Sequence, residues 1–109
     1  MDLSKDLVIA VRIYEYNLLD EPVWFARLVK EFEDAGIMSR ATVAKYARKL
    51  LFFGIIGDEW VNIDGKWVRT FAIDENALSL IESIAEKYPS SLGQPKKGEL
   101  PQKAEATLL

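Results

Sequence analysis

The chain has 109 residues and contains neither cysteine nor histidine. The lack of cysteine excludes disulfides and thiolate metal ligands. The lack of histidine excludes catalysis by an imidazole and leaves carboxylates as the sole ligands for any zinc or haem site. These two absences remove the commonest metal centres and acid–base mechanisms, so we expect no metal and no cofactor.

The sequence also lacks a long apolar run. The apolar stretch Leu7–Val11 is preceded by Lys5 and Asp6 and followed by Arg12. It is too short and too charged to span a bilayer, and it does not have the layout of a signal peptide. Hydrophobic residues make up 50% of the chain, which is enough for the core of one ordinary domain. We therefore expect a cytoplasmic protein that does not contact the membrane.

The features of an enzyme are missing as well. The chain has no glycine-rich phosphate loop, no internal repeat and no nucleophile–base pair. Its acidic pairs, Glu33-Asp34 and Asp58-Glu59, are adjacent in sequence, so their side chains point apart on a helix or strand. We therefore expect that the protein is not an enzyme.

Positive charge is scarce overall but concentrated in the middle of the chain. The formal net charge is −3. Residues 36–70 carry six basic and three acidic side chains. By contrast, residues 1–35 carry four basic and eight acidic side chains, and residues 71–109 carry four basic and six acidic side chains. The six central basic residues are Arg40, Lys45, Arg48, Lys49, Lys66 and Arg69. This distribution favours a nucleic-acid-binding segment, and the alternative is a solvated basic face without a ligand.

Apolar spacing predicts a first helix from about Leu3 to Leu18. One apolar stripe consists of Leu3, Leu7, Ala10, Val11, Tyr14 and Leu18. A second stripe consists of Ile9, Ile13 and Tyr16. Because a helix on one core needs one stripe, we expect the second stripe to lie in a dimer interface. The alternative is that a later helix or the C-terminal segment of the same chain covers it.

A second helix is predicted to run to about Asp34. Asp20 or Glu21 can cap it, and Pro22 fits its first turn because the missing N–H has no partner there. Gly36 follows the helix and accepts the left-handed conformation that ends it.

A third helix is predicted from Arg40 to about Phe53, with Ser39 as its cap and Gly54 at its end. Its core face consists of Val43, Ala44, Ala47, Leu50 and Leu51. The opposite face consists of Thr42, Lys45 and Lys49, with Arg48 at the flank. The small alanines allow close packing on the second helix.

Alternating residues predict two strands, Glu59–Ile63 and Lys66–Ile73. Asp64-Gly65 between them is a strong signal for a two-residue hairpin turn. The resulting register sets Trp60 opposite Arg69 and Asn62 opposite Trp67. We expect one hairpin face to lie on the core, and its members are Trp60, Trp67, Phe71 and Ile73.

A fourth helix is predicted from about Glu75 to Tyr88, with Asp74 as its cap and Pro89 after it. We expect its residues Leu80 and Ile84 to contribute to the dimer interface. The domain then spans residues 1–88. Residues 89–109 are rich in proline and glycine, so we expect a flexible tail, and the alternative is a strap across a partner.

The third helix and its exit resemble the recognition-helix pattern of small winged-helix transcriptional regulators of the MarR, PadR and ArsR-like groups. The matching residues are Ser39-Arg-Ala-Thr-Val-Ala-Lys-Tyr-Ala-Arg-Lys-Leu50 and Gly54-Ile-Ile. The resemblance covers residues 1–88 and implies a mainly α fold with a small β-hairpin (α+β), in the order helix, helix, helix, strand, strand, helix. Phe52 and Phe53 depart from the pattern, which has charged or small residues there. The acidic Asp64 at the hairpin tip argues against deep contacts by the wing.

The resemblance implies sequence-specific binding of double-stranded DNA by a homodimeric transcriptional regulator, with the third helix (about 39–53) in the major groove. Arg40 and Lys45 are the candidates for base contacts, because long cationic side chains can donate to guanine O6 and N7. The candidates for phosphate contacts are Ser39, Thr42, Arg48, Lys49 and Lys66. The alternatives are a plain helix-start preference for Thr42 and a solvated lysine for Lys49.

Two other functions are compatible with the sequence. Winged helices also serve as protein-docking modules in transcription and replication machinery, without reading DNA. A ligand-responsive repressor could bind a small-molecule effector in an aromatic pocket, although aromatic residues at helical spacing more often lie in the core. The candidate pocket residues are Tyr16, Trp24, Phe25, Phe52 and Phe53.

Overall fold

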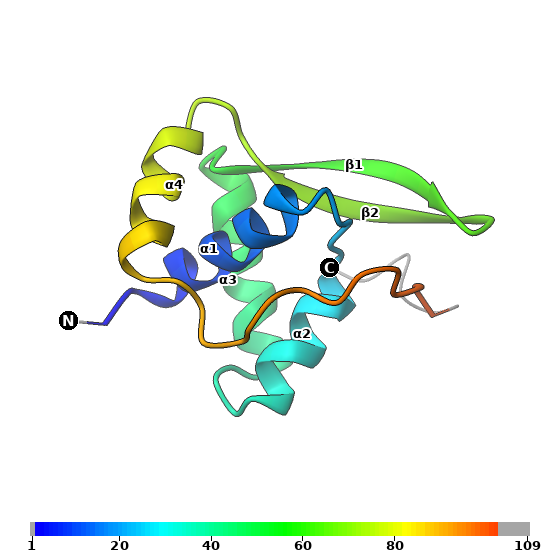
Figure 1. Ribbon diagram of the computed structural model, residues 1–109, viewed down its shortest axis with the longest axis horizontal. Helices are drawn as coiled ribbons and strands as arrows, with labels where there is room; N and C mark the ends of the chain where they lie inside the picture. Colours follow the sequence, from blue (N-terminus) through cyan, green and yellow to red (C-terminus); the bar gives the residue numbers. More distant parts are fainter. Residues whose placement is uncertain (1, 103–109) are drawn as a thin grey trace.

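The computed structural model describes residues 2–102 and contains four helices and one antiparallel hairpin (Figure 1). In chain order the elements are α1 (Lys5–Leu18), α2 (Phe25–Asp34), α3 (Arg40–Phe52), β1 (Ile56–Ile63), β2 (Lys66–Ile73) and α4 (Leu78–Lys87). This order confirms the predicted α+β winged-helix arrangement. In the part of the chain that the structure describes, no helix has the length and apolarity needed to cross a membrane.

The central element of the core is α1, which packs against α3, α4 and β2. Ile9 and Ile13 have no exposed surface, and Tyr16 is 1% exposed. The prediction that these three residues form a dimer interface is therefore wrong. Neighbouring elements of the same chain cover the second stripe, so its burial requires no partner subunit.

The segment before α2 is extended rather than helical. The amide of Phe71 donates to the carbonyl oxygen of Val23 at 2.9 Å, and Trp24 forms a β-bridge with Thr70. Pro22 is consequently not in a first helical turn, and α2 begins at Phe25. The sequence signal for a helix start does not prevail here, because Val23 and Trp24 pair with β2 and form a short third strand-like segment beside the hairpin.

The hairpin turn and register agree with the sequence analysis. Asp64 and Gly65 both have positive φ, at 52° and 83°, as a type I′ turn requires. Trp60 pairs with Arg69 and Asn62 with Trp67. β1 begins at Ile56, three positions earlier than predicted.

The outer half of the hairpin does not lie on the core. Phe71 and Ile73 at its root are buried, but Trp60 is 54% exposed and Trp67 is 60% exposed. The prediction that all four pack on the core is wrong for the two tryptophans, because the hairpin projects past the helices (Figure 1). On its other face, Val68 is buried.

The turn before α4 also differs from expectation. The carboxylate of Asp74 accepts a hydrogen bond from the amide of Asn76 at 2.9 Å, and its carbonyl accepts one from Ala77 at 2.9 Å. Asp74 therefore stabilises a turn, and α4 begins only at Leu78.

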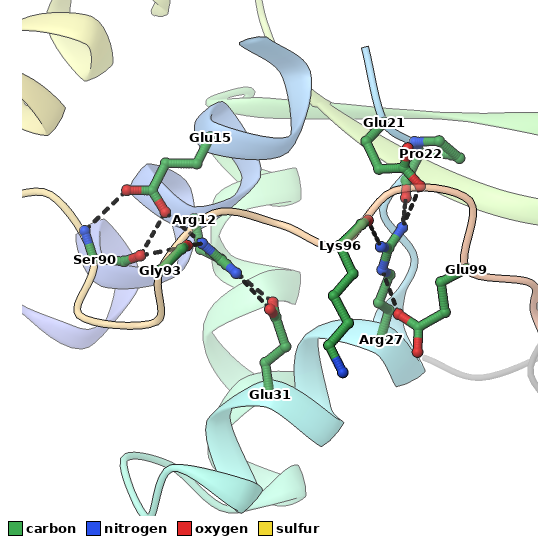
Figure 2. Close-up of polar contacts among 10 residues, drawn as sticks. All are labelled: Arg12, Glu15, Glu21, Pro22, Arg27, Glu31, Ser90, Gly93, Lys96 and Glu99. Carbon is green, nitrogen blue, oxygen red and sulfur yellow. Dashed lines mark hydrogen bonds and ion pairs between the residues drawn. The ribbon is translucent and has the colours of Figure 1, made fainter. Parts of the chain in front are cut away.

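Residues 90–101, which we call the C-terminal strap, cross α1 and α2 in an extended path (Figures 1 and 2). Arg12 Nη1 donates to the carbonyl oxygen of Gly93 at 2.5 Å, and Arg27 Nη2 donates to that of Lys96. The amide of Gly98 donates to Glu21 Oε1 at 3.0 Å. The segment predicted as a flexible tail over residues 89–109 therefore contacts the helices and the hairpin between Ser90 and Pro101, and residues 103–109 lie outside the described residues.

Two arginines that hold the strap are buried, which sequence reasoning did not predict. Arg12 is 0% exposed and Arg27 is 3% exposed. Their guanidinium carbons lie 5.1 and 4.5 Å from the centroid of the Tyr16 ring. Figure 2 shows the acceptors that make this burial tolerable: Arg12 faces Glu15 and Glu31, and Arg27 faces Glu21, Pro22 and Glu99.

Candidate nucleic-acid interface

The start of α3 is held by a local hydrogen-bond network. Ser39 Oγ accepts from the amide of Thr42 at 3.3 Å and donates to Thr42 Oγ1 at 3.1 Å. The amide of Arg40 donates to Glu33 Oε2 of α2 at 3.2 Å. Ser39 is the predicted cap, and its hydroxyl and that of Thr42 are both engaged at the helix start.

The two faces of α3 are distinct. Val43, Ala47 and Leu50 are buried against the core, as predicted. The opposite side carries a stripe at spacings of four, three and four residues, and its exposed members are Ala41, Lys45, Arg48 and Phe52. We call this set the outer stripe of α3. Since it points away from the core, it is the face of α3 most open to a groove, and Arg40, the first residue of the helix, lies outside this set.

Lys45 and Arg48 are the cations of the outer stripe. Both are exposed, and within residues 2–102 neither forms an ion pair. The ammonium of Lys45 lies 5.3 Å from the centroid of the Tyr46 ring. Arg40 is exposed at the start of the helix, with its guanidinium carbon 5.2 Å from the Phe25 ring centroid. These three cations are available to an anionic ligand.

Lys49 is directed toward α1. Its ammonium lies 3.4 Å from Asp6 Oδ2. Burial raises the pKa of Asp6, but hydrogen bonds from Ser4, the Leu7 amide and Lys49 outweigh this effect, so the pKa is lowered overall. The carboxylate is therefore ionised at neutral pH and compensates much of the Lys49 charge.

Lys66 is also engaged within the chain. Its ammonium donates to the carbonyl oxygen of Pro101 in the strap at 3.1 Å. Arg69, the other basic residue of the hairpin, is paired with Asp58. The two hairpin cations are therefore engaged with other groups of the described chain, and the candidate interface consists of the α3 residues Arg40, Lys45 and Arg48.

The end of α3 carries two exposed aromatic rings. Phe52 is 84% exposed and Phe53 is 64% exposed, and their rings meet edge to face at 5.3 Å. Phe52 belongs to the outer stripe, whereas Phe53 lies off it. The sequence marked both positions as departures from the family pattern, and the structure shows that both rings are exposed, with Phe52 on the same helix face as the cations.

The predicted aromatic pocket does not form. Tyr16, Trp24 and Phe25 are buried in the core, while Phe52 and Phe53 are exposed. A cleft of about 630 Å³ does lie between α1, the hairpin and α4, but none of these five residues lines it. Among the described residues there is also no cluster of three potential metal ligands.

Comparisons with known proteins support the fold. No protein-family model and no curated protein matches the sequence. A PadR family transcriptional regulator from Eggerthella lenta DSM 2243 superposes with a TM-score of 0.54 and 20% identity, over 76% of this chain and 70% of that one. The E41A mutant of Lactococcus lactis ZitR superposes with a TM-score of 0.57 and 16% identity, over 79% of this chain and 53% of that one. At these identities the likeness establishes a winged-helix fold, and this chain spans about half the length of ZitR.

Proposed function

We propose that the protein is a transcriptional regulator that binds double-stranded DNA as a homodimer, with α3 in the major groove. The observation that carries the proposal is the outer stripe of α3, where Lys45 and Arg48 are exposed and have no ion pair among the described residues, in a chain of net charge −3. The similar fold of a PadR family transcriptional regulator supports the same function. The width of the major groove, about 12 Å, admits one α-helix.

Each cation has a distinct role in this proposal. Arg40 and Lys45 donate to the edges of bases, and Arg48 contacts a phosphate at the edge of the groove. Ser39 and Thr42 lie at the helix start, where backbone amides favour a phosphate. Lys49 and Lys66 contact phosphates only if they leave Asp6 and Pro101, so we assign them a secondary contribution.

We assign the dimer contact to α4. Leu80 is 62% exposed and Ile84 is partly buried, although both side chains are apolar. Ile9, Ile13 and Tyr16 have no surface left to contribute. A two-fold dimer would present two copies of α3 to successive major grooves, about 34 Å apart.

Fluorescence anisotropy with promoter fragments and random duplexes tests DNA binding. We expect salt-sensitive binding between about 50 and 200 mM salt, with one fragment preferred. Lys45→Ala/Arg48→Ala should abolish it. The matched control is Lys30→Ala/Lys87→Ala, which removes the same charge from exposed positions on α2 and α4. Equal losses in the two double variants would show a non-specific charge effect and would contradict reading by α3.

A protein-docking function is the second candidate, and the exposed Phe52–Phe53 pair favours it. The same titration separates the two functions. Absence of binding to every duplex at low salt would exclude the proposed regulator and leave protein docking as the better account of the fold.

A further inference from the structure

Phe52 is the most exposed large hydrophobic residue among those described, at 84%. It lies four residues after Arg48 and seven after Lys45, so it shares their face of α3. Its ring meets the exposed ring of Phe53 edge to face, with the centroids 5.3 Å apart, and this aromatic pair continues a helix face that carries two cations. The surface that covers it therefore has to accept positive charge and an apolar ring together.

A second copy of this chain does not meet that requirement. A two-fold contact centred on Phe52 would bring Arg48 and Lys45 of both copies close together, and like charges oppose such a contact. A polyanion does fit the cations, but it must also offer an apolar group beside its charges. The major groove of DNA offers one, because thymine carries a methyl group on C5 between the two phosphate backbones.

We infer that Phe52 reads thymine by packing against its C5-methyl group, and so helps to determine the sequence that the protein prefers. This inference rests on the proposed DNA binding. Ala41 lies on the same stripe eleven residues earlier, so the two apolar positions are about 16 Å apart along the helix. That length matches about five base pairs. Both positions can therefore face bases only if α3 lies along the groove and does not insert by its N-terminal end alone.

The test replaces thymine by deoxyuridine, which removes only the methyl group. The duplex preferred by the wild-type protein is synthesised with thymine and with deoxyuridine at every thymine position, and both forms are titrated by anisotropy. Removal of each methyl group that Phe52 contacts should raise the Kd by about fourfold, which is the effect expected for the burial of one apolar carbon. Phe52→Ala should reduce the difference between the two duplexes by about fourfold for each methyl group that Phe52 contacts, and Phe52→Leu should keep part of that contribution.

Phe53→Ala is the matched control, because Phe53 is also exposed at the end of α3 but lies off the stripe. It should keep the preference for thymine. The inference is overturned if wild type binds both duplexes equally. It is also overturned if Phe52→Ala keeps the full difference, since the methyl groups would then act through DNA shape. Loss of binding by the wild type to all duplexes would instead overturn the proposed function together with this inference.

Discussion

The guanidinium of Arg12 and the carboxylate of Glu31 form a two-point ion pair between α1 and α2, with N–O distances of 3.0 and 2.5 Å. Arg12 has no exposed surface, and its remaining nitrogen bonds Glu15, Ser90 and Gly93. One buried cation thus joins the first two helices to the strap. Burial lowers the pKa of Arg12, but the two carboxylates outweigh it and raise the pKa overall, so the charge is permanent.

Arg12→Met should destabilise the fold by about 3 kcal/mol, because it removes the cation that Glu15 and Glu31 face and the donor to the Gly93 carbonyl. Urea denaturation followed by circular dichroism measures the loss. Lys30→Met is the control, since the Lys30–Asp34 pair is exposed at both ends and should contribute less than about 0.5 kcal/mol. Equal losses in the two variants would contradict the structural role of Arg12.

The strap and Arg27 should be energetically coupled. In the full chain, Arg27→Met should cost about 3 kcal/mol, because Glu21, Glu99 and the Lys96 carbonyl lose a buried partner. In a chain that ends at Pro89, the same substitution should cost clearly less, since two of those partners are already gone. A double-mutant cycle from urea denaturation measures the coupling, and strict additivity would show that the strap does not depend on Arg27.

Tyr16 should limit stability at alkaline pH. Burial and the neighbouring Glu31 carboxylate raise its pKa above the ordinary value of 10.0, against the opposing effect of Arg27 and Arg12. As the pH rises above 10.0, the unfolded chain releases this proton while the folded chain keeps it, so stability falls by up to about 1.4 kcal/mol per pH unit. Urea midpoints measured from neutral to alkaline pH should fall less steeply for Tyr16→Phe. If the urea midpoints of wild type and Tyr16→Phe fell equally with pH, the proposed role of Tyr16 would be wrong.

Releasing Lys49 should strengthen DNA binding. Asp6→Asn removes the carboxylate 3.4 Å from Lys49 and should tighten binding by about threefold at low salt, as expected for a charge at the rim of an interface. Asp2→Asn, at an exposed position on the same segment, controls for the change in net charge. If both variants bind equally well, Lys49 has no specific contact with the duplex.

The α4 contact should determine the oligomeric state. Leu80→Glu/Ile84→Glu introduces four like charges into a two-fold interface and should reduce the mass in sedimentation to that of one chain, 12.4 kDa. Leu18→Glu changes an equally exposed leucine on α1 and should leave the dimer intact. A dimer that survives the double substitution would move the interface away from α4.

Features that depend on neighbouring residues could be predicted without the fold. The Ser39 cap, the end of α3 at Gly54 and the Asp64-Gly65 turn were all predicted, because each depends on hydrogen bonds or backbone angles within a few positions. The hairpin register followed from its turn. The order of helices and strands followed from the periods of the apolar residues, and this order was sufficient to predict the fold.

Which surfaces stay exposed depends on how distant parts of the chain pack together. Val23 and Trp24 are extended because β2 lies beside them, and Trp60 is exposed because none of the four described helices reaches the outer hairpin. The strap is held in position because Arg12 and Arg27, which lie more than sixty residues earlier in the chain, donate hydrogen bonds to its carbonyl oxygens from buried positions. Contacts of this kind depend on where distant segments meet in space. Periodicity and spacing therefore could not predict that Lys49 and Lys66 are engaged with Asp6 and Pro101, while Lys45 and Arg48 form no ion pair within residues 2–102.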